Sequence, residues 1–218
     1  MIKAVFFDVG GTLIAPYPSV GAIYSEVAGR HGISLTPEVL NLRFRKAWGK
    51  QKSRRALVDK SWWRAVVDDI FEGSSFKDQN GFFEELYREF EKKDSWRLFP
   101  DVIETLAQLR ERGIRLAVAS NWDERLPALL KTLGLAPYFE RQFISFDLKI
   151  SKPDVRFFNH ALQTMGLKPL EALHVGDDPV EDIEGAQKAG LRAYRIDRIH
   201  KPKNSRTLSS LDEILLRL

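Results

Sequence analysis

The sequence predicts an α/β fold in which a Rossmann-like, mostly parallel sheet carries an inserted α-helical subdomain. The first observation is the apolar run Ala4–Phe7, which ends directly in Asp8 and is typical of a buried parallel strand before a loop. The second is a helical periodicity of apolar residues over residues 15–98, and the third is a renewed alternation of strand and helix patterns after it. We therefore expect an α/β core of residues 1–14 and 99–218, with residues 15–98 as a helical insertion.

The loop after the first strand carries polar groups suited to binding an anion or a cation. Ligands of open α/β sheets bind outside the carboxyl ends of the strands, and Asp8 lies at such an end. Gly10 and Gly11 permit positive φ and a close approach of the backbone to a ligand, while Thr12 offers a hydroxyl and a backbone donor to an anion. An ordinary strand-to-loop turn has the same pattern, so this loop alone leaves both interpretations open.

The helical insertion is predicted from apolar residues that recur at positions i, i+3, i+4 and i+7. A further helix is expected to begin at Thr36-Pro37 and to bear Leu40, Phe44 and Trp48. Because the insertion follows the first strand, it leaves and rejoins the sheet at the end where Asp8 lies, and we expect it to cover the site. The three periodic sets are Val20, Ile23, Tyr24 and Val27; Trp63, Val66, Val67 and Ile70; and Phe83, Leu86, Tyr87 and Phe90.

The remaining elements follow from stop signals and apolar runs after residue 99. Asp101 and Glu104 are expected to form a capping box at the start of a helix, and residues 208–218 to form a terminal helix. Each expected helix end is a glycine followed by Ile or Leu, which is typical of a left-handed cap with an apolar contact behind it. These glycines are Gly113, Gly134, Gly166 and Gly190. Strands are expected near residues 115–120, 142–145, 172–175 and 192–196.

The composition is that of a soluble globular protein, with 218 residues, 44% of them hydrophobic and 29% charged. We find no apolar window of membrane-spanning length and no signal-type segment, so we expect a cytoplasmic protein that does not bind membranes, as a monomer or weak dimer. The absence of cysteine excludes disulfides and thiolate sites, and with four histidines a metal would need oxygen ligands. The formal net charge of +4 does not by itself indicate nucleic acid and suits small anionic substrates.

One basic segment, residues 43–55, contains seven basic residues and no acidic residue. We interpret it as a solvated helix face, with steering of anions towards the site as the alternative. Nucleic-acid binding is not expected, because no recognised reading module accompanies the charges. The basic stretch of residues 192–206 is interpreted in the same way. The seven basic residues are Arg43, Arg45, Lys46, Lys50, Lys52, Arg54 and Arg55.

Four strand or loop ends supply a carboxylate, a hydroxyl, an ammonium and clustered acids, in that order along the chain. They are Asp8, then Ser120-Asn121, then Lys152, then Gly176-Asp177-Asp178 with Asp182. This set and its order resemble the haloacid dehalogenase-like hydrolase superfamily of the helical-cap (C1) type. The segments SNWDERL at Ser120–Leu126 and SKPD at Ser151–Asp154 also resemble the subgroup of the rhythmically expressed gene 2 protein and the haloacid dehalogenase-like hydrolase domain-containing protein 3.

The resemblance implies a hydrolase that acts on a small phosphorylated metabolite. Asp8 would be the nucleophile and would form an aspartyl phosphate, assisted by Thr12. Phosphate would be bound by Gly11, Ser120, Asn121 and Lys152, with the lysine offsetting negative charge as a point charge. A strand-end serine is also a common structural feature, and Asn121 is in addition a common turn former. His174, within a strand, is expected to be buried or hydrogen-bonded rather than catalytic.

The resemblance also implies a Mg²⁺ site. Asp8, the backbone carbonyl of Gly10 and Asp177 would hold the ion, with Asp178 and Asp182 as additional or indirect ligands. The alternative for Asp178, which precedes Pro179, is a helix N-cap, and Asp182 would then favour the positive end of that helix. In the superfamily the helical insertion is a mobile cap that closes over substrate.

Gly10 is the main departure from the family pattern. Phosphatases and phosphomutases of the superfamily carry a second aspartate there, which protonates the leaving group and then activates water. Glycine can do neither. General acid–base catalysis contributes roughly 10²–10⁴-fold, so its loss would raise the barrier by about 3–5 kcal/mol. We therefore expect a slow phosphatase that prefers good leaving groups such as aryl and acyl phosphates, and we do not expect a mutase.

Two other functions stay open at this point. A 2-haloacid dehalogenase would use Asp8 to displace halide from carbon without metal, and the crowded acids at Gly176-Asp177-Asp178 argue against it, because metal-free chemistry has no need of carboxylates that repel one another. A non-catalytic phosphate-binding protein is the third possibility. Metal binding and docking of phosphate analogues without hydrolysis would favour it.

Overall fold

The computed structural model of the protein describes residues 1–52, 57–200 and 206–218. The chain divides into two compact units, Met1–Ile14 with Leu98–Leu218, and Ala15–Arg97. It passes between them through strands β2 and β3, which pair in a two-stranded sheet and have the bounds Ile14–Pro16 and Trp96–Leu98. The bounds of the two units lie within one residue of the division expected from the sequence. That the helical unit covers the site stays a prediction.

The α/β unit contains a six-stranded parallel sheet in the order β5-β4-β1-β6-β7-β8. The predicted α/β, Rossmann-like fold is therefore confirmed. Strand β1 lies between β4 and β6, and Phe7 pairs with Val118 on one side and Val175 on the other. Asp8 consequently enters its loop between the carboxyl ends of both neighbours. The strands are β1 (Ala4–Phe7), β4 (Arg115–Ser120), β5 (Arg141–Ile144), β6 (Ala172–Gly176), β7 (Arg192–Ile196) and β8 (Thr207–Leu208).

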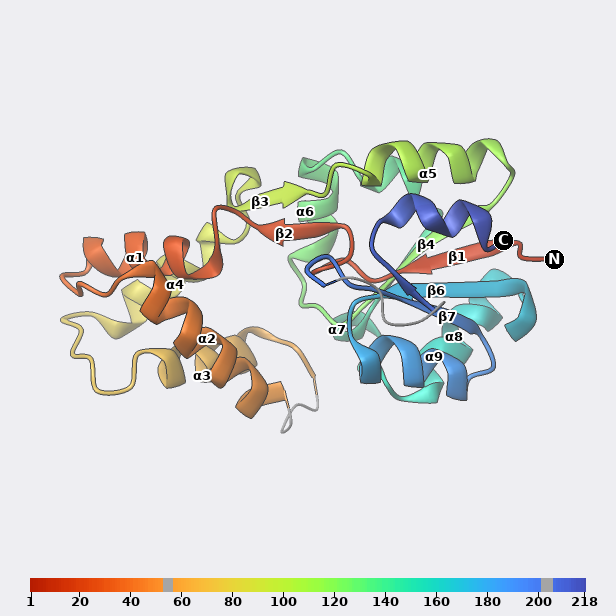
Figure 1. Ribbon diagram of the computed structural model, residues 1–218. Coiled ribbons are helices and arrows are strands. Elements are labelled where there is room, and N and C mark those ends of the chain that lie inside the picture. The colour runs from red at the N-terminus through yellow and green to blue at the C-terminus, as the bar shows by residue number, and fades with distance from the viewer. Residues whose placement is uncertain (53–56, 201–205) are drawn as a thin grey trace. The chain divides into compact units, whose positions relative to one another are not determined.

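Helices cover both faces of this sheet. Figure 1 shows α5 on one face and α8 with α9 on the other. Phe6 of β1 packs in one buried cluster with Phe157 and Phe158 of α8, which fixes the strand against this layer. The helices are α5 (Val102–Glu111), α6 (Leu126–Thr132), α7 (Ser145–Leu148), α8 (Val155–Met165) and α9 (Gly185–Lys188). Short helical turns lie at Ala136–Tyr138, Pro169–Glu171, Pro179–Glu184 and Leu211–Leu216. The four predicted glycine stops, residues 113, 134, 166 and 190, all have positive φ.

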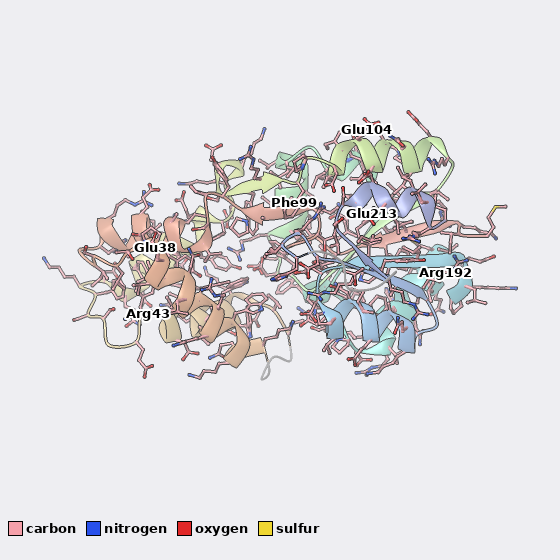
Figure 2. The ribbon with its side chains drawn as sticks, in the orientation of Figure 1. Glu38, Arg43, Phe99, Glu104, Arg192 and Glu213 are labelled. Atoms are coloured by element: carbon pink, nitrogen blue, oxygen red, sulfur yellow. The ribbon has the colours of Figure 1, made fainter. Side chains whose placement is uncertain are left out.

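The expected capping box of α5 is wrong. Asp101 precedes the helix but makes no capping bond: its backbone is helical (φ −86°, ψ −6°) rather than extended, and its Oδ2 accepts bonds from Arg198 Nη1 at 2.5 Å and from the Leu211 N–H at 2.6 Å. Glu104, labelled on α5 in Figure 2, instead accepts a bond from Gln108 at 2.6 Å. A charged donor from a distant segment competes for the carboxylate that local sequence assigns to the helix end.

The expected terminal helix over residues 208–218 is also wrong. Thr207–Leu208 forms β8, which pairs with β7, and only Leu211–Leu216 is helical, as a 3₁₀ turn. This turn packs against α5, so tertiary contact shortens a segment whose apolar pattern suggested a longer helix.

Within the described residues the helical unit contains four helices with buried apolar faces, as the periodicity predicts. Their buried faces form one core, in which Tyr24, Phe71 and Phe82 are among the aromatic members. The helices are α1 (Val20–Arg30), α2 (Pro37–Lys52), α3 (Lys60–Ile70) and α4 (Gln79–Glu89), and a short turn follows at Lys93–Ser95. No helix in the described ranges is long and apolar enough to cross a membrane.

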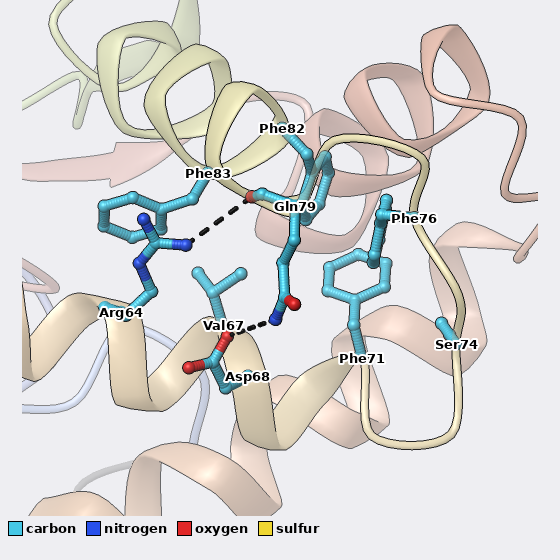
Figure 3. Close-up of a pocket in the computed structure, with 9 residues that line it drawn as sticks. All are labelled: Arg64, Val67, Asp68, Phe71, Ser74, Phe76, Gln79, Phe82 and Phe83. Carbon is cyan, nitrogen blue, oxygen red and sulfur yellow. Dashed lines mark hydrogen bonds between the residues drawn. The ribbon is translucent and has the colours of Figure 1, made fainter.

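A small pocket of this unit lies between α3 and α4 (Figure 3). Arg64 lies over the ring of Phe83 at 4.0 Å and reaches the Gln79 carbonyl at 3.5 Å. The Gln79 amide in turn donates to Asp68 at 3.1 Å. Arg64, Gln79 and Asp68 are therefore linked to one another at this pocket, and the rest of its lining is mostly aromatic.

The basic segment of residues 43–55 is partly used for packing. Arg43, labelled on α2 in Figure 2, donates to the Ile70 carbonyl at 3.0 Å, and Lys50 pairs with Asp69 at 2.5 Å. These contacts attach α2 to the end of α3. Arg54 and Arg55 lie outside the described residues, as does part of the later basic stretch, residues 201–205.

Candidate active site

Asp8 is the centre of a polar cluster at the carboxyl edge of the sheet. Its N–H donates to the Val175 carbonyl at 2.9 Å and so continues the pairing of β1 with β6. Its carboxylate accepts bonds from Ser120 Oγ and from Lys152 Nζ, each at 2.9 Å and each to Oδ1. Among the described residues no donor is bonded to Oδ2, which therefore remains open to another ligand. The prediction that residues 8, 120 and 152 converge is confirmed.

Lys152 is held between two carboxylates. Its Nζ lies 2.9 Å from Asp8 Oδ1 and 2.5 Å from Asp182 Oδ1, and its side chain is buried. Asp182 is buried as well, and it also accepts bonds from His174 Nε2 at 2.9 Å and from the Asp178 N–H at 3.0 Å. Three donors thus hold Asp182, whose main observed role is to position the lysine. His174 is buried and hydrogen-bonded, as predicted for a strand residue.

Asp177 lies against the glycine loop that follows β1. Gly11 has φ +73°, and a Cβ built on it would lie 2.5 Å from Asp177 Oδ2. The backbone conformation therefore favours glycine at this position, and any larger residue would displace the Asp177 carboxylate. The carbonyl of Asp177 accepts a bond from Arg195 Nε at 3.0 Å, which fixes the backbone behind the carboxylate.

Two predicted residues have structural roles at the edge of the cluster. Asp178 is an N-cap, because its Oδ1 accepts bonds from the N–H groups of Val180 at 3.0 Å and Glu181 at 2.8 Å. The geometry supports the capping alternative and gives no support to Asp178 as a metal ligand. Asn121 bonds both backbone groups of Lys152, with its Nδ2 2.9 Å from the carbonyl and its Oδ1 2.8 Å from the N–H. Asn121 therefore holds the lysine loop.

The remaining loop residues contribute through their backbone. The Gly11 N–H donates to the Ile14 carbonyl at 2.8 Å, so this donor is used inside the loop rather than held for phosphate. The Thr12 N–H donates to the Val9 carbonyl at 3.3 Å, and the buried Thr12 hydroxyl has no partner among the described residues. Gly10 bridges to Ile14, and a metal-binding role for its carbonyl stays a prediction.

The charges of the cluster are strongly coupled. Burial raises the pKa of Asp8, although the Lys152 ammonium opposes this. Burial, together with the charges of Asp8 and Asp182, raises the pKa of Asp177 to about 8. Burial disfavours the charged forms of Asp182 and Lys152 too, but their mutual attraction prevails, so the pKa of Asp182 is lowered and that of Lys152 raised. The lysine pair is therefore ionised at neutral pH, whereas at Asp177 the Lys152 charge only partly offsets burial and the repulsion by nearby carboxylates.

A divalent cation fits this cluster. Asp8, Asp177 and Asp182 each offer a carboxylate oxygen, and these three atoms lie within 4.8 Å of one another. When ionised, three carboxylates face one ammonium, and the raised pKa of Asp177 reflects this excess of negative charge. An all-oxygen donor set of this kind suits a hard cation such as Mg²⁺. Asp8 and Asp177 are the better candidates as ligands, because Asp182 is already held by three donors.

Sequence reasoning missed two arginines that support the site. Arg195 binds the Asp177 carbonyl, and Arg198 Nη2 donates to the Thr12 carbonyl at 2.6 Å. The only sign of them in the sequence was that Arg195 and Arg198 lie at or just after the end of β7. A charged residue at such a position does not reveal which distant carbonyl it will meet.

Comparisons with known proteins agree with this geometry. The family model described as haloacid dehalogenase-like hydrolase matches residues 2–190. The haloacid dehalogenase-like hydrolase domain-containing protein 3 of Homo sapiens is 31% identical over 205 residues, which cover 89% of this chain and 82% of that protein. This relative confirms the predicted subgroup.

Solved structures with the same fold include two different kinds of enzyme. A HAD phosphatase from Thermococcus onnurineus matches with a TM-score of 0.71 and 25% identity, covering 99% of this chain and 97% of that one. A 2-haloacid dehalogenase from Pseudomonas syringae pv. Tomato DC3000 matches with a TM-score of 0.68 and 27% identity, covering 100% and 99%. The family match spans residues 2–190 and so includes Asp8, Ser120, Lys152 and Asp177, which the structure brings together. The chain therefore belongs to the haloacid dehalogenase-like hydrolase family.

Proposed function

We propose that this chain is a Mg²⁺-dependent phosphatase that hydrolyses a small phosphorylated metabolite through an aspartyl phosphate, and that it works slowly. The observation that carries the proposal is the buried Asp8 carboxylate held by Ser120 and Lys152 beside the extra carboxylate of Asp177. The phosphatase from Thermococcus onnurineus supports the same reaction class by its likeness.

In the first step a carboxylate oxygen of Asp8 forms a bond to phosphorus. The bond from phosphorus to the leaving oxygen breaks, and its electron pair stays on that oxygen. Ser120 Oγ and Lys152 Nζ lie around the attacking carboxylate, where they can donate to the oxygens of the transferred group. Because these donors are fixed before the reaction, they stabilise developing charge without reorganising. A bound Mg²⁺, held by Asp8 and Asp177, would neutralise further charge on the phosphoryl group.

In the second step water attacks the phosphorus and the bond to Asp8 breaks. Inorganic phosphate leaves, the carboxylate is regenerated, and the proton of the water must pass to a base. Gly10 has no side chain to accept this proton or to protonate the leaving group earlier. The missing catalysis corresponds to roughly 10²–10⁴-fold in rate. Slow turnover with accumulation of the aspartyl phosphate is therefore expected.

A 2-haloacid dehalogenase is the second candidate. The structural likeness to the Pseudomonas syringae enzyme favours it, as does a site without a second aspartate. Against it stands Asp177, whose pKa is raised to about 8 because burial and nearby carboxylates oppose its charge. Displacement of halide needs no cation, whereas the three converging carboxylates supply the oxygen donors of a divalent-cation site.

A substrate panel tests the proposal directly. We expect phosphate release from a set of phosphate monoesters only when Mg²⁺ is present, with loss on addition of chelator and recovery on re-addition of the metal. Chloride release from 2-chloropropionate, measured in chelator, is expected to be absent. Chloride release that survives chelation would instead establish the dehalogenase. Binding of metal and phosphate without either reaction would favour a non-catalytic protein.

The Gly11 contact gives a sharper test of the metal site. Gly11→Ala and Gly134→Ala both place a side chain at positive φ, +73° and +75°, and each is expected to lower the free energy of unfolding by about 1–2 kcal/mol. Only the first also displaces Asp177, because nothing lies within 4 Å of a Cβ at Gly134. We expect Mg²⁺ to raise the melting temperature of the wild type and of Gly134→Ala, and not of Gly11→Ala. An equal Mg²⁺ response in both variants would show that Asp177 does not hold the ion.

A further inference from the structure

Gly10 is restricted by a neighbouring side chain rather than by its backbone. It is not among the glycines with positive φ, so its conformation suits any residue. A Cβ built on it, however, would lie 3.2 Å from Cζ3 and 3.9 Å from Cη2 of Trp122. The six-membered ring of the indole therefore lies against the position at which related phosphatases carry their second aspartate.

Trp122 is held firmly at this place. Its N–H donates to Ser145 Oγ at 3.2 Å, and its carbonyl accepts bonds from Ser145 Oγ at 3.2 Å and from the Phe146 N–H at 3.3 Å. The preceding Asn121 is fixed by both backbone groups of Lys152. The backbone of Trp122 is thus tied to the start of α7 and, through Asn121, to the lysine loop, and its side chain is half-buried.

We propose that Trp122 is a specificity-determining residue that selects phosphate monoesters with an aromatic leaving group. This inference rests on the proposed function and names its substrate class. The second aspartate of related phosphatases acts on the leaving oxygen, so the group that lies against position 10 faces the leaving group. In this chain the group against position 10 is the indole of Trp122, which presents a flat apolar surface in place of a proton donor.

Two independent effects, the missing acid at Gly10 and the apolar surface of the indole, favour the same substrates. An aryl oxide leaves without being protonated, so the absence of an acid at Gly10 costs little in the first step. An aromatic leaving group also packs on the indole in a stacked or edge-to-face geometry, which contributes a few-fold to about 10-fold in binding. An acyl phosphate has an equally good leaving group but no ring, so it separates the two effects.

The test compares 4-nitrophenyl phosphate with acetyl phosphate in the wild type, Trp122→Phe and Trp122→Ala. We expect Trp122→Ala to lower kcat/KM for the aryl ester by about 5- to 10-fold and to change that for acetyl phosphate by less than about twofold. Trp122→Phe retains most of the aryl preference because it retains a ring. An equal loss for both substrates would show that Trp122 only supports the fold, and the inference would be overturned.

A binding measurement separates this inference from the proposed function. Phenylphosphonate and methylphosphonate cannot be hydrolysed at phosphorus, so their dissociation constants are measurable by calorimetry whether or not turnover occurs. We expect the phenyl preference to fall about 5- to 10-fold in Trp122→Ala and to persist in Trp122→Phe. Preserved preference in both variants contradicts the role of Trp122, whereas absence of any ester hydrolysis by the wild type contradicts the phosphatase.

The same contact predicts a coupling between the two positions. Gly10→Asp alone forces the new side chain against the indole, whereas Gly10→Asp with Trp122→Ala gives it room. We expect the double variant to hydrolyse propyl phosphate at least about 10-fold faster than either single variant, because an alkyl oxide needs protonation. Additive effects of the two substitutions would show that the indole does not occupy the place of the acid.

Discussion

Replacing Asp8 by asparagine is expected to reduce phosphate release by about 10⁴-fold or more, while the chain stays folded. The amide cannot form the aspartyl phosphate, so the loss falls on the first chemical step. Folding should survive because burial already disfavours the charged form of Asp8, and Lys152 keeps its pair with Asp182. The measurement is acid-quenched labelling with a ³²P-labelled aryl phosphate, together with steady-state phosphate release.

The matched control is Asp147→Asn, which removes an exposed carboxylate outside the cluster. We expect it to retain wild-type turnover and labelling. Label should accumulate on the wild type, since slow hydrolysis of the intermediate follows from Gly10. If Asp8→Asn were labelled or turned over normally, the nucleophile would be another residue and the proposed mechanism would be wrong.

Replacing Lys152 by methionine is expected to lower the free energy of unfolding by about 3–5 kcal/mol and to abolish turnover. Among the described residues Lys152 is the only side chain that bonds both Asp8 and Asp182, and without its buried ammonium two buried carboxylates lie close together. Because the folded pKa of Lys152 is raised, its contribution is fully present below the unfolded pKa and is lost only as pH rises towards the folded value. Denaturant unfolding at pH 7 therefore measures the full contribution of Lys152 to the free energy of unfolding.

A second substitution distinguishes stability from catalysis. Lys152→Met combined with Asp182→Asn removes one of the repelling charges, and we expect it to recover at least half of the lost stability without recovering turnover. Lys60→Met, which breaks an exposed pair with Glu84 at 2.7 Å, is the control and is expected to cost less than about 1 kcal/mol. Recovery of activity in the double variant would mean that Lys152 serves only the fold.

Several features of the site were predictable because they depend on local pattern. An apolar run fixes a buried strand, and polar residues directly after parallel strands meet at one edge of the sheet. Asp8 and Ser120 follow from this rule. Asp177 directly follows another apolar strand and so falls under the same rule, whereas Lys152 lies in a loop whose own sequence does not reveal where it points. The family resemblance supplied the roles of both residues. The helical unit was predictable for the same reason, since each helix shows its buried face in its period.

Other features could not be predicted, because they depend on which distant atoms meet. Asp101 has the sequence of a helix cap, yet Arg198, far along the chain, takes its carboxylate. Asp178 has the sequence of either a ligand or a cap, and the position of the following turn makes it a cap. Both outcomes depend on which donors folding brings to the carboxylate, and local sequence does not settle this.

Local sequence patterns specify the α/β core, the helical insertion and the strand ends that carry the reactive groups, because periodicity and turn residues act over a few positions. The tertiary structure alone decided that His174 and Asp182 hold Lys152, and that the indole of Trp122 lies where Gly10 leaves room for it. The physical reason is the separation along the chain over which each kind of information acts. Hydrophobic pattern specifies which face of an element is buried, whereas hydrogen bonds and close packing depend on atoms that folding brings within a few ångströms.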